Sequence, residues 1–74
     1  AAYLVPRMLF PSRLWEPGDI LDIPLPEDPG HFCVGGQRRG DTDWEYFITE
    51  GFCPGIGGAW VTQSLLVEFG AYKV

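Results

Sequence analysis

The sequence predicts an all-β fold: a small antiparallel β-sheet domain with an extended N-terminal arm. Of the 74 residues, 10 are glycine and 7 are proline, and they interrupt every stretch that could form a long helix. Apolar residues make up 46% of the chain and aromatic residues 15%, which is too much for a disordered segment. A chain of this length has room for one domain. We place that domain at residues 15–74 and the arm at residues 1–14.

Two short strands are expected in the first half of the domain. The segment Gly18–Leu25 contains Ile20, Leu21 and Ile23, after which Pro24 and Pro26 cannot donate ladder hydrogen bonds. The segment His31–Val34 comes after a Pro-Gly turn signal and is expected to end at Gly35 and Gly36. A polar turn is expected at Arg38–Asp43, and we interpret its Arg-Gly-Asp tripeptide as turn residues.

Alternating side chains predict two further strands. The strand Trp44–Thr49 carries one set on each face, namely Trp44, Tyr46 and Ile48 against Glu45, Phe47 and Thr49. The longest alternation runs from Trp60 to Val74 and predicts a C-terminal strand whose shared face is Val61, Leu65, Val67, Phe69 and Ala71. Between them, Pro54–Gly58 is expected to be a flexible loop, because no phosphate-binding Lys-Ser or Lys-Thr follows its glycines.

The arm is apolar but has no helical or strand periodicity, and Pro6 and Pro11 interrupt it. Such a segment cannot form a regular sheet edge, so its side chains must be buried either by the domain or by a neighbouring subunit. The residues that we expect at an assembly interface are Tyr3, Leu4, Val5, Met8, Leu9 and Phe10.

The charge distribution and the apolar runs exclude two classes of partner. The chain has 5 basic and 10 acidic residues, a net charge of −5, which argues against nucleic-acid binding because phosphates require a basic surface. No apolar run approaches the roughly 18 to 20 residues of a membrane span, so no membrane insertion is expected. The N-terminus lacks the pattern of a signal peptide, yet its Ala-Ala start leaves the compartment open.

The two cysteines leave two alternatives open. A disulfide between Cys33 and Cys53 would close a loop of about 20 residues and contribute roughly 3 kcal/mol to the stability of a small domain. The preferred expectation is a pair of buried free thiols in a reducing cytosol, because two cysteines fall short of a disulfide-rich secreted scaffold.

No metal, cofactor or catalytic centre is expected. One histidine, His31, and two distant cysteines do not match the ligand spacing of a zinc site. The acids Asp41, Asp43 and Glu45 begin like a calcium loop, but the sixth and twelfth positions are Tyr and Phe, so we expect these acids on a solvated strand face. There is no nucleophile elbow, and His31 and Cys33 are expected to be packing neighbours on one face. The protein is therefore predicted not to be an enzyme.

Aromatic side chains are the remaining candidates for binding. Tryptophan and tyrosine rings can stack on the C–H faces of sugars, and in a small domain they also have to build the core. Both interpretations apply to Trp15, Trp44, Tyr46 and Trp60.

The order of several motifs resembles the small chitin-binding modules, over a region from about Trp15 to Gln63. The motifs are Trp15-x-x-Gly18-Asp19-x-Leu21, the strand His31-Phe32-Cys33-Val34, and Pro54 followed by Trp60. The pattern implies a turn at Gly18-Asp19, a core filled by Phe32 and Val34, and a Trp60 that closes this core. Where the family has exposed aromatic residues, this chain has Gly35 and Gly36. The segment Asp41–Glu50 is added relative to the family, and it either restores an aromatic platform or only adds a packing strand. In the first case, which we prefer, Trp44 and Tyr46 are expected to face outward.

Domains similar to these modules also occur on the capsid and tail proteins of tailed bacteriophages. This resemblance and the apolar arm together suggest a structural virion accessory protein, a capsid cement or decoration protein. Its expected partners are a major capsid protein or another virion protein and further copies of itself, most simply as a trimer. Its candidate residues for contacting host-surface glycans are Trp44, Tyr46 and Trp60. The alternative is a small secreted carbohydrate-binding module or inhibitor with a Cys33–Cys53 disulfide.

Overall fold

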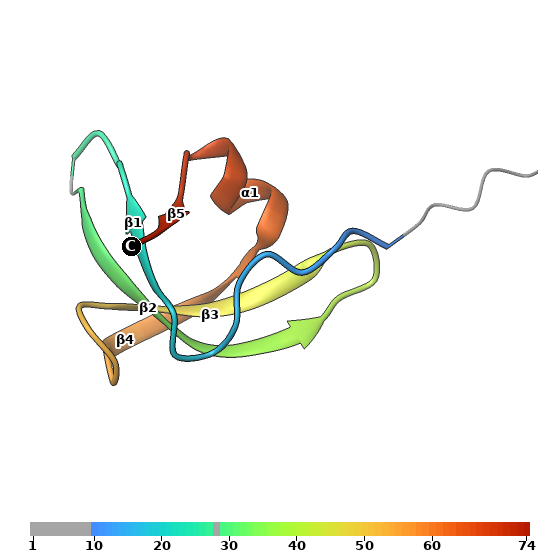
Figure 1. Cartoon of the computed structure of the whole chain (residues 1–74), viewed down its shortest axis with the longest axis horizontal. Coiled ribbons are helices and arrows are strands. Elements are labelled where there is room, and N and C mark those ends of the chain that lie inside the picture. The colour runs from blue at the N-terminus through green and yellow to red at the C-terminus, as the bar shows by residue number, and fades with distance from the viewer. Residues whose placement is uncertain (1–9, 28) are drawn as a thin grey trace, which may run out of the picture.

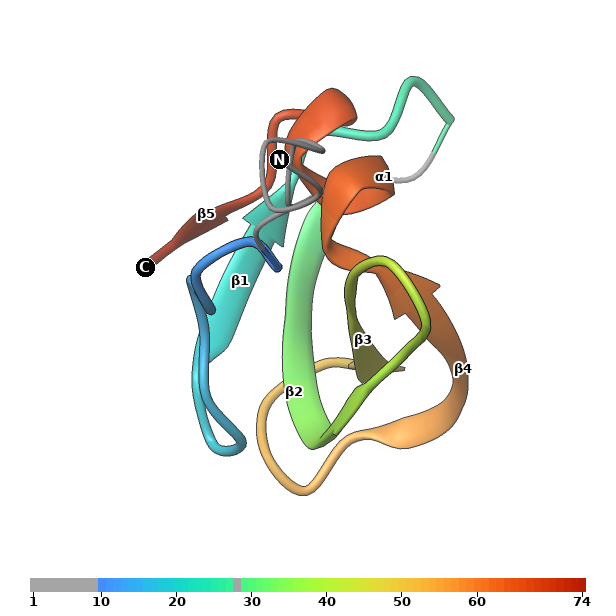
Figure 2. The ribbon, with the colours of Figure 1, turned by 90° about the vertical axis from the view of Figure 1, so that its right-hand side faces the viewer.

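The chain forms one five-stranded antiparallel sheet and a single short helix among the residues that the structure, a computed structural model, describes: 10–27 and 29–74 (Figure 1). The strand order is β4-β3-β2-β1-β5, and Figure 2 shows it from β5 on the left to β4 on the right. The predicted all-β fold is therefore confirmed. The elements are β1 (Ile20–Ile23), β2 (Gly30–Arg39), β3 (Trp44–Glu50), β4 (Ile56–Thr62), α1 (Gln63–Glu68) and β5 (Tyr72–Lys73).

A tight turn leads into β1, as the Gly18-Asp19 pair predicts. The backbone amide of Asp19 donates to the carbonyl oxygen of Glu16 at 3.1 Å, and the Glu16 amide donates to the Asp19 carboxylate at 3.0 Å. The strand that follows buries Leu21 and Ile23 on one face. It ends before Pro24, because proline has no amide hydrogen for the ladder.

Strand β2 is longer than the sequence predicts. It runs from Gly30 to Arg39 and continues through Gly35 and Gly36, where its register with β3 shifts at a bulge. The prediction that these glycines end the strand is therefore wrong. Strand β3 occupies Trp44–Glu50, close to its predicted bounds, and the turn before it begins at Gly40, whose amide donates to the carbonyl oxygen of Asp43 at 2.9 Å.

The C-terminal region is not the long strand that its alternation predicts. Strand β4 ends at Thr62, whose side chain accepts a hydrogen bond from the Leu65 amide and so caps α1. The helix buries Gln63 and Leu66, which lie three residues apart on one helical face. The predicted loop Pro54–Gly58 is also partly wrong, because β4 already begins at Ile56.

The core lies on the face of the sheet that carries Tyr46 and Ile48, which we call the inner face. Leu66 from α1 and Trp15 from the segment before β1 belong to the same core cluster, so both elements cover this face. The shared face predicted for Trp44, Tyr46 and Ile48 is confirmed, but it points into the protein. The buried core residues are Trp15, Leu21, Ile23, Val34, Tyr46, Ile48 and Leu66.

The end of the predicted arm that lies within the described residues packs on the domain. The ring of Phe10 contacts Trp44 edge-on with 5.3 Å between centroids, and the Trp44 indole N–H donates to the carbonyl oxygen of Pro11 at 2.8 Å. Phe10, one of the residues expected at an assembly interface, is half-buried against its own domain. The other expected interface residues, Tyr3, Leu4, Val5, Met8 and Leu9, lie outside the described residues.

Cys33 and Cys53 form a disulfide with 5.2 Å between their Cα atoms, so the preferred expectation of free thiols is wrong. The Cys33 side chain projects from the face opposite the core, which we call the outer face, and the loop between β3 and β4 folds back over it. The backbone amide of Gly51 in this loop also donates to the carbonyl oxygen of His31 at 3.0 Å.

Candidate functional site on the outer sheet face

The predicted aromatic platform does not assemble, because its members lie on opposite faces of the sheet. Tyr46 is completely buried in the core, and Trp44 lies on the same inner face, half-buried against Phe10. Trp60 pairs in register with Phe47, which alternation places on the outer face. The expectation that Trp44 and Tyr46 face outward is therefore wrong, and Trp60 alone of the three lies on the outer face.

The outer face carries a different pair of rings, Phe47 from β3 and Trp60 from β4. Their centroids are 5.4 Å apart with 58° between the ring planes, and Trp60 is 41% exposed. Trp60 therefore does not close the core, in contrast to the sequence prediction. Two aromatic residues directly opposite on neighbouring strands are a common stabilising pair, so this contact also orients the two rings.

Glycines let these rings lie close to the sheet. A Cβ atom on Gly58 would lie 2.6 Å from the Phe47 ring, which is closer than atoms can approach. A Cβ atom on Gly36 would lie 3.5 Å from the Trp60 ring, in ordinary contact. Gly36, which the sequence suggested as a strand end, thus lies beneath the rings inside a continuous strand.

A charged pair borders the rings. The guanidinium carbon of Arg38 lies 4.1 Å from the centroid of the Trp60 ring, and its Nε–H donates to the Glu45 carboxylate. Arg38 and Glu45 are directly opposite in the β2–β3 ladder. The Arg38 side chain is 53% exposed and the Glu45 side chain 27% exposed, which leaves donors and an acceptor at the margin of the aromatic surface. We call Phe47, Trp60, Arg38 and Glu45 the Trp60 platform.

Sequence reasoning named Trp60 but missed Phe47, Arg38 and Glu45. The signal for Phe47 was present in the alternation of β3. The set Trp44, Tyr46 and Ile48 is more apolar than the set Glu45, Phe47 and Thr49, and the more apolar face of a half-buried sheet is the core face. That rule would have placed Phe47 outside and Tyr46 inside.

The acids of the β2–β3 turn do not share a solvated face. Asp43 is buried, and its carboxylate accepts hydrogen bonds from the Ser64 amide at 2.7 Å, the Ser64 hydroxyl at 2.6 Å and the Trp44 amide at 2.8 Å. Burial raises the pKa of Asp43, but these hydrogen bonds outweigh it and hold the pKa below its ordinary value. Asp43 thus fastens the start of α1 to the turn, while Asp41 is exposed and Glu45 pairs with Arg38.

In the described part of the chain, His31 and the two cysteines are engaged in structural contacts. Cys33 is in the disulfide, and His31 contacts the Phe52 ring edge-on at 5.3 Å. Within residues 10–27 and 29–74, no three His, Cys, Asp or Glu side chains come together in a group that could hold a metal ion. No helix among these residues is long and apolar enough to cross a membrane.

No protein-family model, curated protein or solved structure matches this chain.

Proposed function

We propose that this protein is a non-catalytic binding module that holds a carbohydrate on its Trp60 platform. The observation that carries the proposal is the Trp60–Phe47 ring pair on the outer face of the sheet, opposite the core, where Trp60 stays 41% exposed. Apolar C–H faces of sugar rings stack on aromatic rings, and a few fixed polar groups then set the orientation of the ligand.

The charged pair supplies such polar groups. Arg38 occupies one face of the Trp60 ring, so a sugar would contact Phe47 and the remaining exposed part of Trp60. The guanidinium donates hydrogen bonds and the Glu45 carboxylate accepts them, which suits the hydroxyl groups of a sugar. Because Arg38 and Glu45 already hold each other in place, the ligand would meet a preorganised surface.

The sequence resemblance to chitin-binding modules supports the same class of ligand, and Trp60 belongs to both arguments. The disulfide supports an oxidising compartment for this role, because such bonds persist outside the reducing cytosol. The secreted carbohydrate-binding alternative therefore becomes the preferred setting.

Retention on insoluble chitin and cellulose, followed by titration with their soluble oligosaccharides, tests the proposal. Trp60→Ala and Phe47→Ala should each weaken binding at least about twofold and by up to about tenfold, since stacking of one aromatic ring is worth about 0.5 to 1.5 kcal/mol beyond burial. The control is Val67→Ala, which removes an exposed apolar side chain from α1. A parent protein without retention on any polysaccharide, or a Trp60→Ala variant that binds like the parent, would contradict the proposal.

A second candidate function is assembly, as in a capsid decoration protein of a tailed bacteriophage. It is favoured by three exposed apolar side chains in α1 and at its C-terminal end. These are Leu65, Val67 and Phe69, which are 40%, 52% and 43% exposed. A short helix that is apolar on both its inner and outer sides is typical of a covered surface. Light scattering should then give a trimer that Val67→Lys converts to a monomer, whereas a monomeric parent would contradict this candidate.

A further inference from the structure

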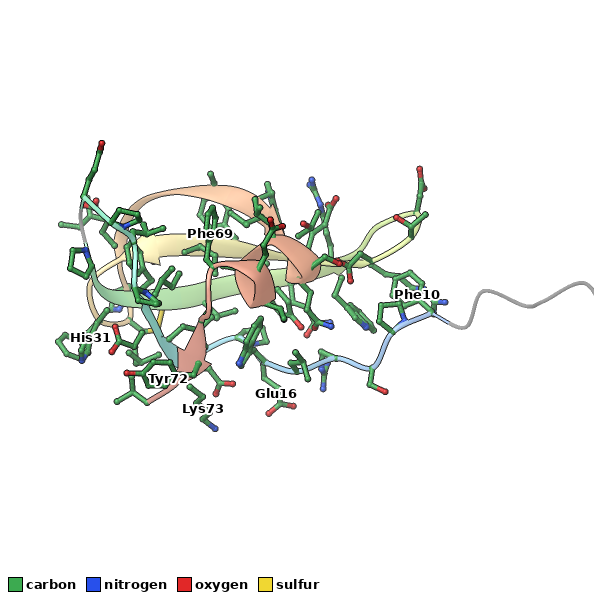
Figure 3. The ribbon with its side chains drawn as sticks, turned by 90° about the horizontal axis from the view of Figure 1, so that it is seen from above. Phe10, Glu16, His31, Phe69, Tyr72 and Lys73 are labelled. Atoms are coloured by element: carbon green, nitrogen blue, oxygen red, sulfur yellow. A yellow bond between two sulfur atoms is a disulfide. The ribbon has the colours of Figure 1, made fainter. Side chains whose placement is uncertain are left out.

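A second set of exposed aromatic and polar side chains lies on the outer face, across β5, β1 and β2. Tyr72 in β5 is opposite Asp22 in β1, and Asp22 is in turn opposite His31 in β2. Residues directly opposite in an antiparallel ladder share a face, so the three side chains form a row across three strands. Figure 3 shows His31 and Tyr72 on the same side of the molecule.

Phe52 extends this row beyond His31. Its ring contacts the His31 imidazole edge-on with centroids 5.3 Å apart, yet Phe52 remains 66% exposed. The neighbouring Cys53 is linked to Cys33 in β2 by the disulfide, and the Gly51 amide donates a hydrogen bond to the His31 carbonyl oxygen. The loop is thus held so that a large apolar ring lies beside His31, outside the core.

The polar groups of the row are oriented. The Tyr72 hydroxyl donates to one carboxylate oxygen of Asp22 at 2.7 Å, and this hydrogen bond raises the pKa of Tyr72 above its ordinary value. Tyr72 nevertheless remains 55% exposed, so its ring is accessible from solvent. The Asp22 carboxylate can accept more hydrogen bonds than Tyr72 supplies, and an imidazole can donate or accept.

Two accessible rings with a carboxylate and an imidazole between them match the chemistry of a sugar ring, which offers C–H faces and hydroxyl groups. The row contains a carboxylate, and the whole chain carries a net charge of −5, so an acidic sugar would be repelled. We propose that Tyr72, Asp22, His31 and Phe52 form a second subsite, which binds a neutral saccharide. The proposal relies on the carbohydrate-binding function for its ligand class, but it stands on different residues from the Trp60 platform.

The test uses the full chain and three soluble probes, namely oligomers of N-acetylglucosamine, oligomers of glucose and an oligomer of a uronic acid. Binding is followed by calorimetry and by amide chemical shifts. Tyr72→Ala and Phe52→Ala should each weaken binding of a neutral oligosaccharide at least about twofold and by up to about tenfold, as expected when one stacking ring is removed. The control is Val74→Ala, which lies two residues beyond Tyr72 and removes another exposed apolar side chain.

The variants separate this subsite from the Trp60 platform. Loss of binding in Trp60→Ala, with parent-like binding in both Tyr72→Ala and Phe52→Ala, would overturn the second subsite and leave the proposed function intact. Loss in the latter two variants alone would support the subsite and contradict the platform. Absence of binding to all three probes, or preference for the uronic acid oligomer, would overturn the subsite. Because Phe52 is in a loop, its variant remains informative if Tyr72→Ala disturbs β5.

Discussion

The hydroxyl of Tyr46 donates a 2.6 Å hydrogen bond to the side-chain carbonyl oxygen of Gln63 inside the core. Gln63 also accepts from the Leu14 amide at 3.0 Å and donates to the Ser12 carbonyl oxygen at 2.9 Å. One glutamine thus links β3, the start of α1 and the segment before β1. Among the described residues, no buried side-chain polar atom lacks a hydrogen-bond partner. The polar side chains within this core therefore act as connectors between segments that are distant in sequence.

The first prediction concerns this connection. Tyr46→Phe should lower the free energy of unfolding by about 1 to 2 kcal/mol, because Gln63 loses one donor and the Trp15 amide, 3.4 Å from the hydroxyl, loses its acceptor. Urea denaturation followed by tryptophan fluorescence measures the change. The control is Tyr72→Phe, which removes an exposed hydroxyl and should change stability less. Equal effects of the two variants would contradict a special role for the buried hydroxyl.

The second prediction concerns pH. The folded-state pKa of Asp43 lies below its ordinary value of 3.8, so its contribution to stability is present above that value and is lost as pH falls through the folded pKa. The free energy of unfolding of the parent should therefore decrease below about pH 4. Asp43→Asn should be less stable at pH 7 by about 1 to 3 kcal/mol and should lose less upon acidification.

Urea melts between pH 2.5 and 7 measure this pH dependence. The control is Asp41→Asn, an exposed acid of the same turn, whose pH profile should follow that of the parent. If Asp43→Asn shows the same acid sensitivity as the parent, the hydrogen bonds from Ser64 and Trp44 do not stabilise the ionised carboxylate.

The third prediction concerns the disulfide. The bond joins residues with a sequence separation of 20, and chain-entropy arguments assign about 3 kcal/mol to a loop of this size. Adding a reductant should lower the urea midpoint of the parent. It should leave the midpoint of the double variant Cys33→Ala/Cys53→Ala unchanged. Alkylation of both cysteines in the native protein without reductant would show that the bond does not form.

The sequence predicts well the features that depend on local patterns. The turn at Gly18-Asp19 and the strand that begins at Trp44 follow from residue types within a few positions. The segment after Thr62 shows where local pattern fails. The apolar residues of this segment alternate as they would in a strand. The segment nevertheless forms a helix, which Thr62 caps and which buries Gln63 and Leu66, three residues apart, on one face. The alternating residues Leu65, Val67 and Phe69 remain exposed.

The candidate site depends on contacts that no local pattern contains. Trp60 could be named as a candidate from its residue type, because tryptophan rings can stack on sugars, but its partner Phe47 follows from the register between β3 and β4. The sequence also could not decide between a disulfide and two free thiols, because the same spacing of the cysteines is compatible with both. It is the return of the β3–β4 loop over β2 that brings Cys53 to Cys33.

The fourth prediction concerns the close approach of the Phe47 ring to Gly58 in β4. Gly57 and Gly58 both have positive φ, of 70° and 144°, so an alanine at either position carries backbone strain. They differ in space, because a Cβ atom at Gly57 would meet nothing within 4 Å, whereas one at Gly58 would lie 2.6 Å from the Phe47 ring. Gly58→Ala should therefore lose about 1 to 3 kcal/mol more stability than Gly57→Ala, since the ring has to move and since a φ of 144° lies farther from the left-handed region that alanine can reach.

The same pair of variants reports on binding. If Phe47 is displaced in Gly58→Ala, the amide chemical shifts of Trp60 and Gly36 should change, and binding of a soluble oligosaccharide should weaken under conditions in which both variants are folded. Gly57→Ala should keep the parent's shifts at these two positions and its affinity, because its added methyl group points into open space. Equal losses of stability in the two variants would mean that backbone strain alone explains both glycines, and that the close approach of Phe47 to Gly58 does not constrain the platform.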